Sequence, residues 1–262
     1  MTPISEYHRP ATLDAALELL ARPAPRTRPL GGGTHFRGRL PQAEALVDLR
    51  LLHLGGIQRA GNAWKLGAAA TLEEVLQAGE LPPALRRAAG RQAAYNARQR
   101  ATLGGLVAAA DSGPLLACLL ALNTQVDLEP GAQVVPLDLF LANDDLASKS
   151  LVLSLAFNPG RRLGLAMLGR SPADAPILSV AVAATRAGDG LQQVWAAAGA
   201  AGQPWWFERQ LDPADSAAAL QRAAGVAWQD DVRASAGYRQ SMLPVLLRRA
   251  LAELELEVSR EG

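Results

Sequence analysis

The stretch Leu30-Gly31-Gly32-Gly33-Thr34-His35-Phe36 places three glycines in a row ahead of a threonine. Glycine loses more backbone entropy on folding than any other residue, so such a run indicates a special backbone path. Without Cβ atoms, successive N–H groups can converge on one anion, and Thr34 adds a hydroxyl donor. The spacing matches neither G-x-x-x-x-G-K-[ST] nor G-x-G-x-x-G. A phosphate-binding turn and a plain tight turn therefore both remain open.

A second stretch repeats the arrangement of a threonine beside paired glycines. It reads Arg98-Gln99-Arg100-Ala101-Thr102-Leu103-Gly104-Gly105-Leu106. Two such turns can hold one diphosphate between them, which favours the phosphate-binding interpretation of both.

Composition limits the classes of protein that the chain can belong to. At 262 residues, with 49% hydrophobic residues and a net charge of +1, it is typical of a soluble globular protein of two or three subdomains. The near-neutral net charge lacks the excess of positive charge that is typical of proteins that bind nucleic acid. No apolar run approaches the roughly eighteen residues of a membrane span, and the first residues do not resemble a secretory signal. We therefore expect a cytoplasmic protein without a membrane span.

Cysteine and histidine usage argues against metal chemistry in this chain. The single cysteine, Cys118, cannot form an internal disulfide or hold an iron–sulfur cluster, which normally takes four thiolates. It lies among leucines, which favours a buried structural thiol. The three histidines lack the spacing of a metal site, so we predict no metal.

Apolar periodicity and capping signals predict an alternation of helices and strands. Thr12 is expected to cap the first helix, Thr71 and Glu74 to form a capping box, and Pro244 to start or kink the last helix. The turn at residues 158–162 suggests a domain boundary. Helices are expected at residues 13–20, 72–76, 81–96, 114–122 and 242–254, and strands at 45–49, 63–67, 124–128, 133–137, 150–157, 177–184 and 191–198.

The ordered series of motifs resembles the FAD-binding medium subunit of the xanthine dehydrogenase and carbon monoxide dehydrogenase family of molybdenum hydroxylases. The likeness runs nearly end to end. The motifs that carry it are Gly31-Gly32-Gly33-Thr34, Val47-Asp48-Leu49, Leu66-Gly67-Ala68-Ala69-Ala70-Thr71, Ala101-Thr102-Leu103-Gly104-Gly105, Gly169-Arg170-Ser171-Pro172-Ala173-Asp174, Val180-Ala181-Val182-Ala183 and Gly237-Tyr238-Arg239.

The resemblance implies an α+β fold with two domains. Residues 1–158 would form a PCMH-type FAD-binding domain of two α/β subdomains, about 1–54 and 55–158. Residues 163–262 would form an α/β domain like the C-terminal domain of CO dehydrogenase flavoproteins.

The function that the resemblance implies is electron transfer within a complex. An FAD-dependent oxidoreductase subunit of the xanthine dehydrogenase family would receive electrons from a small [2Fe-2S] subunit. It would pass them to NAD, oxygen or another acceptor, while a large subunit with the molybdenum cofactor oxidises the substrate. No catalytic acid or base is expected in this chain, because the isoalloxazine supplies the redox chemistry. The residues expected to bind FAD are Gly31, Gly32, Gly33, Thr34, His35, Arg98, Thr102, Gly104 and Gly105.

Four departures from the family pattern fall on the cofactor side. Leu106 stands where the family has an asparagine, and Pro114 or Leu115 stands near the position of an aspartate. His35 and Met167 replace an acidic or serine residue and a lysine. These departures favour an alternative, namely a flavin-free interaction subunit that retains the fold. A free-standing flavin oxidase is a third hypothesis, but nothing in the sequence indicates a substrate pocket with its own acid–base pair.

Overall fold

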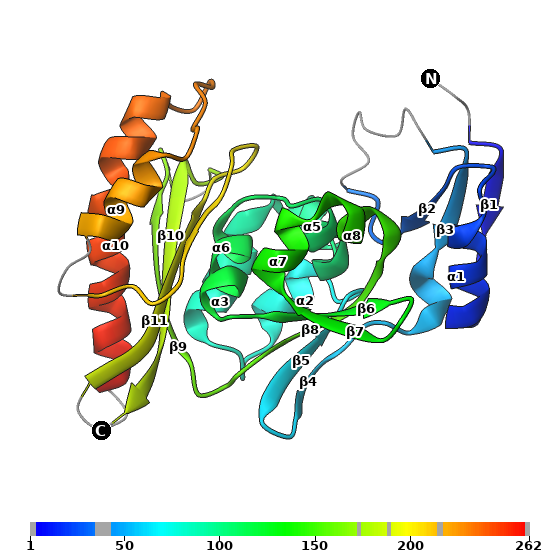
Figure 1. Ribbon diagram of the computed structural model, residues 1–262, viewed down its shortest axis with the longest axis horizontal. Helices are drawn as coiled ribbons and strands as arrows, with labels where there is room; N and C mark the ends of the chain where they lie inside the picture. Colours follow the sequence, from blue (N-terminus) through cyan, green and yellow to red (C-terminus); the bar gives the residue numbers. More distant parts are fainter. Residues whose placement is uncertain (1–3, 35–42, 172–173, 188–189, 214–216, 260–262) are drawn as a thin grey trace.

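The computed structural model describes residues 4–34, 43–171, 174–187, 190–213 and 217–259. Three β-sheets follow one another along the chain, with three, five and four strands. Figure 1 shows the first sheet at one end of the molecule and the second sheet with its helices in the middle. The third sheet and the last helix lie at the other end. This mixed architecture confirms the predicted α+β fold class.

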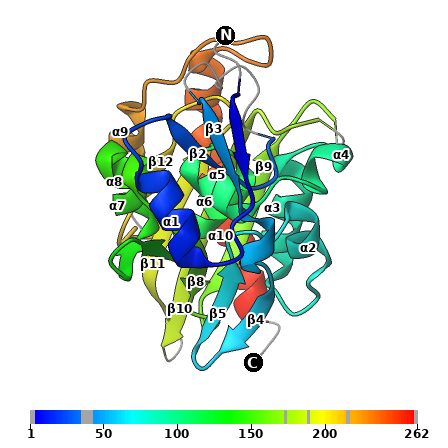
Figure 2. The same ribbon diagram turned by 90° about the vertical axis from the view of Figure 1, so that its right-hand side faces the viewer.

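The first unit, residues 4–52, is a small α/β unit that Figure 2 views from its outer side. Its parallel sheet has the order β1 (Glu6–His8), β3 (Ala45–Asp48), β2 (Thr27–Leu30). Helix α1 (Leu13–Ala21) begins where Thr12 Oγ1 accepts a hydrogen bond from the Ala15 N–H at 3.3 Å, as its sequence predicts. The 3₁₀ helix η1 (Leu49–Leu52) follows β3.

The second sheet is antiparallel, and its strand order is β4-β5-β8-β6-β7. These strands are β4 (Ile57–Ala60), β5 (Ala63–Gly67), β6 (Gln125–Glu129), β7 (Gln133–Pro136) and β8 (Leu151–Phe157). The helices of this part are α2 (Leu72–Gln77), α3 (Pro83–Gln92), α4 (Tyr95–Arg98), α5 (Leu103–Ala108), α6 (Pro114–Ala121), α7 (Leu137–Ala142) and α8 (Asp144–Lys149).

Local signals account for some of these helices and fail for one. The capping box at Thr71 and Glu74 is formed, and α2 begins there as predicted. The single helix expected over residues 81–96 is wrong. Ala93 has an extended backbone (φ −147°, ψ 159°), which ends α3 and separates it from the short α4.

The third sheet is also antiparallel and has the order β12-β11-β10-β9. It comprises β9 (Arg162–Leu168), β10 (Leu178–Ala187), β11 (Gly190–Gly199) and β12 (Trp206–Glu208), and the helices α9 (Ala217–Ala224) and α10 (Ala236–Ser259) lie on its outer face (Figure 1). Pro244 lies inside α10, so of its two predicted roles the start of this helix is wrong, whereas a kink at Pro244 stays a prediction. The sequence Ala187-Gly188-Asp189-Gly190 between β10 and β11 is typical of a hairpin turn, but its residues 188–189 lie outside the described residues.

Helix α6 lies at the centre of the molecule, between the second and third sheets. All eight of its residues are buried, and the seven after Pro114 share one hydrophobic cluster with Leu155 of β8 and Ala181 of β10. Cys118 of this helix is buried, and burial raises the pKa of its thiol, so it is the structural cysteine that the sequence predicts.

The aromatic residues 205–207 contribute side chains to both faces of the third sheet. Trp206 is buried in the outer cluster beneath α10, whereas Trp205 and Phe207 pack against the inner cluster around α6. This alternation follows the period of two along β12.

Two searches of the described residues give no membrane or metal feature. No helix among them combines the length and the apolar character needed to cross a bilayer. Among the same residues, no three or more His, Cys, Asp or Glu side chains gather as metal ligands would.

Candidate functional site

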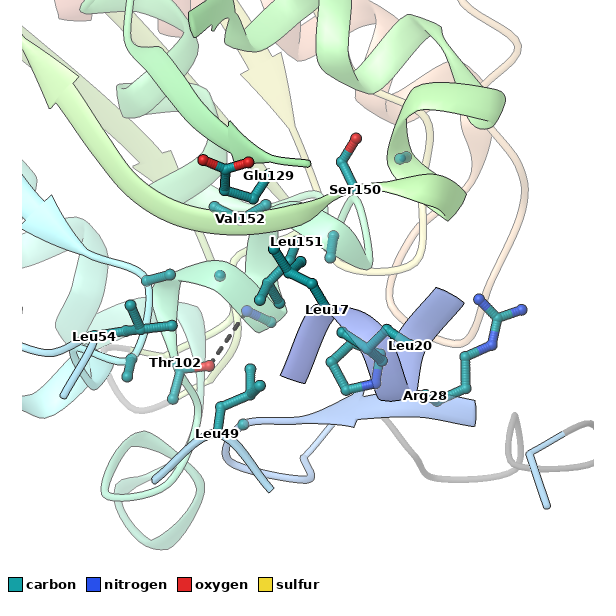
Figure 3. A pocket seen from close by; sticks show the side chains of 18 of the residues that line it. Leu17, Leu20, Arg28, Leu49, Leu54, Thr102, Glu129, Ser150, Leu151 and Val152 are labelled. Atoms are coloured by element: carbon teal, nitrogen blue, oxygen red, sulfur yellow. Dashed lines mark hydrogen bonds between the residues drawn. The ribbon is translucent and has the colours of Figure 1, made fainter. Parts of the chain in front are cut away.

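A cavity of about 860 Å³ lies between the first unit and the second sheet. Its volume falls within the range typical of small-molecule sites. Figure 3 shows its walls, which come from α1, β2, α5, η1, the end of β6, and the start of β8. Both glycine turns line it, although they are about seventy positions apart in sequence. The cavity is therefore the place where the two turns meet.

The first glycine turn packs directly against the backbone that leads into the second. A Cβ added to Gly32 would lie 1.5 Å from the carbonyl oxygen of Arg100, and one added to Gly31 would lie 2.9 Å from Thr102 Oγ1. Gly33 has a φ of 71°, in the left-handed region that favours glycine. All three glycines are thus required by the path of the chain itself.

The second glycine turn is the start of α5, and its own fold uses its N–H groups. The N–H of Leu103 donates to Ala70 O at 2.9 Å, and that of Gly104 donates to Ala68 O at 2.8 Å. The N–H of Gly105 donates to Thr102 Oγ1 at 3.2 Å, the bond drawn in Figure 3. This turn consequently offers a ligand its surface and the Thr102 hydroxyl hydrogen rather than free amides.

The first turn keeps backbone donors for a ligand. Within the described part of the chain, the N–H groups of Gly32 and Gly33 donate to no other described group. Buried or partly buried amides need a partner, and consecutive amides in such a turn suit an anion. Of the two turns, the first is therefore the one with amides suited to an anion.

The rest of the cavity is mainly apolar, with charges at its edges. Leu17 and Leu20 of α1 lie across from Leu151 and Val152 of β8 (Figure 3), and Leu49 and Leu54 lie nearby. Among the described residues, the charged ones in the lining are Glu18, Arg28, Glu129 and Lys149. A cavity with anion-binding amides and long apolar walls fits a ligand that carries both phosphate and aromatic rings.

Seven of the nine residues expected to bind a cofactor line this cavity. They are Gly31, Gly32, Gly33, Thr34, Thr102, Gly104 and Gly105. Arg98 is not among the lining residues, because its guanidinium pairs with Glu73 at 3.0 Å and donates to the carbonyls of Gly90 and Ala93. His35 lies outside the described residues.

Among the described positions that depart from the family pattern, Leu106 and Leu115 lie in the hydrophobic core and Met167 packs against it. Leu106 and Leu115 are fully buried in the cluster around α6. Asp111, the nearby carboxylate, does not line the cavity, and its Oδ2 accepts a hydrogen bond from Gln92 Nε2 at 3.2 Å. The carboxylates that do line it are Glu18 and Glu129. No sequence signal marks Glu129, which is the last residue of β6 and lines the cavity.

Asp48, from the Val47-Asp48-Leu49 motif, stabilises the strand end that adjoins the cavity wall. Its carboxylate is fully buried, pairs with Arg50 at 2.7 Å and with Arg9 at 3.3 Å, and accepts a short hydrogen bond from the Tyr7 hydroxyl. Burial alone would raise the pKa of Asp48, but the bonds from Arg50 and Tyr7 outweigh it and hold this pKa below the usual range. The motif thus fixes the end of β3 next to Leu49 of the cavity wall.

The fold and the cavity together define a dinucleotide-binding protein, with a glycine turn for phosphate and apolar walls for rings. Comparison with known proteins identifies which kind. Residues 3–157 match the family described as "FAD binding domain in molybdopterin dehydrogenase". Because this match covers more than half of the chain, the chain belongs to that family of FAD-binding domains.

Individual relatives agree with this assignment. The carbon monoxide dehydrogenase medium chain of Afipia carboxidovorans is 30% identical over 94% of this chain and 95% of its own length. An uncharacterized protein, YgfM of Escherichia coli K12, is 26% identical over 70% of each chain. The crystal structure of a cyanide-inactivated Cu,Mo-CO dehydrogenase contains a chain with a TM-score of 0.80 and 25% identity, covering 96% of this chain and 97% of that one. The predicted family resemblance is confirmed.

Proposed function

We propose that this chain is the electron-transfer subunit of a molybdenum hydroxylase-like complex and that the cavity between the two glycine turns holds its FAD. The observation that carries the proposal is the meeting of both turns at one cavity with apolar walls. FAD supplies the redox chemistry when it is bound. The protein positions the cofactor and excludes water from it.

Each part of the cavity has a distinct role in this proposal. The N–H groups of Gly32 and Gly33 hold the diphosphate, with hydroxyl donors from Thr34 and Thr102 beside them. The leucines of α1 and β8 cover the rings. Arg98 is assigned to the fold, because its donors already serve Glu73 and two carbonyls.

The proposed partners would supply the chemistry for which this chain has no suitable residues. One buried cysteine cannot ligate an iron–sulfur cluster, so the clusters would lie on a small partner subunit. The molybdenum cofactor and the substrate would lie on a large partner, in keeping with the likeness to a medium chain. Electrons would leave the FAD for NAD, oxygen or another acceptor.

One set of observations favours a second candidate, a flavin-free subunit that serves in assembly. Leu106 and Leu115 bring no polar group to the cavity, and the amides of the second turn are used by the fold. Each hydrogen bond lost to FAD would cost on the order of 1 kcal/mol.

The test is the visible absorption spectrum of the purified chain after FAD is added and the excess removed, with the released cofactor identified by chromatography. Gly33→Ala is expected to abolish flavin retention, because it distorts the turn that holds the diphosphate. Gly61→Ala is the matched control, since Gly61 also has a positive φ, 58°, with open space around it in the β4–β5 turn. A well-folded chain that stays colourless, alone and with its partners, would support the flavin-free subunit instead.

A further inference from the structure

The first unit, residues 4–52, has a very small core of its own. Among its described residues, the buried apolar ones are Pro10, Ala16, Ala43, Ala45 and Val47, and only Pro10 and Val47 are larger than alanine. Among the described residues, both large hydrophobic clusters draw only on residues from Ile57 onward. A unit of this size with so little buried apolar area is marginal by itself.

Few contacts hold this unit to the rest of the described molecule. Gly31 and Gly32 press against Thr102 and Arg100. The segment that leaves the unit is fixed by hydrogen bonds from the Ala69 N–H to Leu54 O at 2.9 Å and from the Gly67 N–H to Gly56 O at 2.8 Å.

The polar side chains of the unit add little to that attachment. Glu6 pairs with Arg22, and Asp48 pairs with Arg9 and Arg50, all within residues 4–52. These ion pairs stabilise the unit internally rather than its docking.

Part of the apolar face of α1 borders the cavity instead of packing on the other described residues of the unit. Its periodicity predicts a core-facing stripe, yet Leu17 and Leu20 are only half-buried and line the cavity. Figure 3 shows them facing the wall that carries Leu151 and Val152. Aromatic rings placed between these walls would bury both of them.

We infer that the bound flavin dinucleotide completes the core that holds residues 4–52 against the rest of the protein, so that this unit opens as a body when FAD is absent. The inference rests on the proposed function. A ligand that binds only the closed form lowers the population of the open form by the factor 1 + [L]/Kd.

Amide hydrogen exchange of the full chain, with and without FAD, tests this inference. Without FAD, the amides of α1, β1 and β3 are expected to exchange at least about tenfold faster than those of α6 and β10. FAD at 100 times its Kd is expected to slow them by roughly 100-fold.

A matched pair of variants in α1 separates the ligand contact from helix stability. Leu20→Ala removes a side chain that lines the cavity and is expected to weaken FAD binding by roughly tenfold. At the same FAD concentration, the slowing should then fall to roughly tenfold. Leu19→Ala, at a half-buried position outside the lining, should change neither quantity.

Two results would contradict the inference in different ways. If FAD binds but the amides of α1 and β3 are already as slow as those of α6 without it, the unit is stable alone and only this inference fails. If absorption shows no FAD binding, the proposed function fails and this inference fails with it.

Discussion

At the scale of single residues, the glycines of the two turns are explained first by packing. A side chain at Gly104 would lie 2.9 Å from Ala68 Cβ and 3.1 Å from Ala68 O, and one at Gly32 would overlap the Arg100 carbonyl. Such substitutions would therefore destabilise the fold whether or not FAD binds. Gly33 needs glycine for its positive φ and also lines the cavity. For this reason Gly33→Ala is the substitution that tests flavin binding.

The buried carboxylate of Asp48 should make the free energy of unfolding depend on pH. Its pKa is depressed in the folded state, so its contribution to stability is present above the unfolded pKa of about 4 and is lost as the pH falls below that value. Asp48→Asn is expected to lower the free energy of unfolding at pH 7 by about 1 to 3 kcal/mol, because Arg50 and Tyr7 lose a charged partner. Urea unfolding at several pH values measures this. The difference between variant and wild type should shrink below about pH 4, and a difference independent of pH would contradict the argument.

At the scale of helices and strands, Arg161 joins three elements. Its Nη2 donates to Ala121 O at the end of α6, to Ala183 O of β10 and to Gln193 O of β11, at 3.2, 3.1 and 2.9 Å. Its guanidinium lies over the Trp195 ring at 4.9 Å. Gln193 has a positive φ where the β10–β11 register shifts, so Arg161 fixes this bulge.

Removing this buried cation should destabilise the third sheet. Burial lowers the pKa of the Arg161 guanidinium to about 10, so it remains charged at neutral pH. Arg161→Met leaves three carbonyls without their donor and is expected to cost about 3 kcal/mol in the free energy of unfolding. Chemical denaturation followed by circular dichroism measures it. Arg59→Met, at an exposed position on β4, is the control and should be neutral; equal effects of the two would contradict this role.

Sequence signals predicted the elements whose determinants are local. Thr12 and Thr71 cap α1 and α2 as expected, and Pro114 begins α6. The break at Ala93 had no such signal, because the fold rather than propensity sets the extended backbone there. Strand β9 and the short helices α7 and α8 were not predicted.

The site was predictable only in part for a related reason. The repeat of a threonine beside paired glycines predicted two turns that share one diphosphate. No sequence signal predicted the pairing of Arg98 with Glu73, which joins two separate helices. The apolar stripe of α1 predicts a buried face without saying that part of this face lines a cavity.

At the scale of the whole molecule, the third sheet contributes residues to the central core around α6. The cluster around α6 includes Leu163, Leu165 and Ala181 from beyond residue 158. Arg87 of α3 also pairs with Glu253 of α10 at 2.6 Å. The boundary near residue 160 is therefore a turn between sheets that share one core.

A fragment of residues 1–158 is accordingly expected to lose cooperative folding. Without the third sheet, the face of α6 that packs on β10 and β11 would be exposed to water. Size-exclusion chromatography and binding of an apolar dye should show association and dye uptake, in contrast to the full chain. A monomeric fragment with a sharp unfolding transition would show instead that the predicted division at 158 separates independent domains.

The tryptophans of the second and third sheets have a consequence for spectroscopy. The five indoles, at positions 64, 195, 205, 206 and 228, all lie beyond the first unit. Intrinsic emission therefore reports on the two larger sheets and is silent about residues 4–52. A melting curve recorded by indole emission can look unchanged while α1 has already separated from the cavity, so a probe placed on that unit, such as a tryptophan at the exposed Leu51, is the signal to follow.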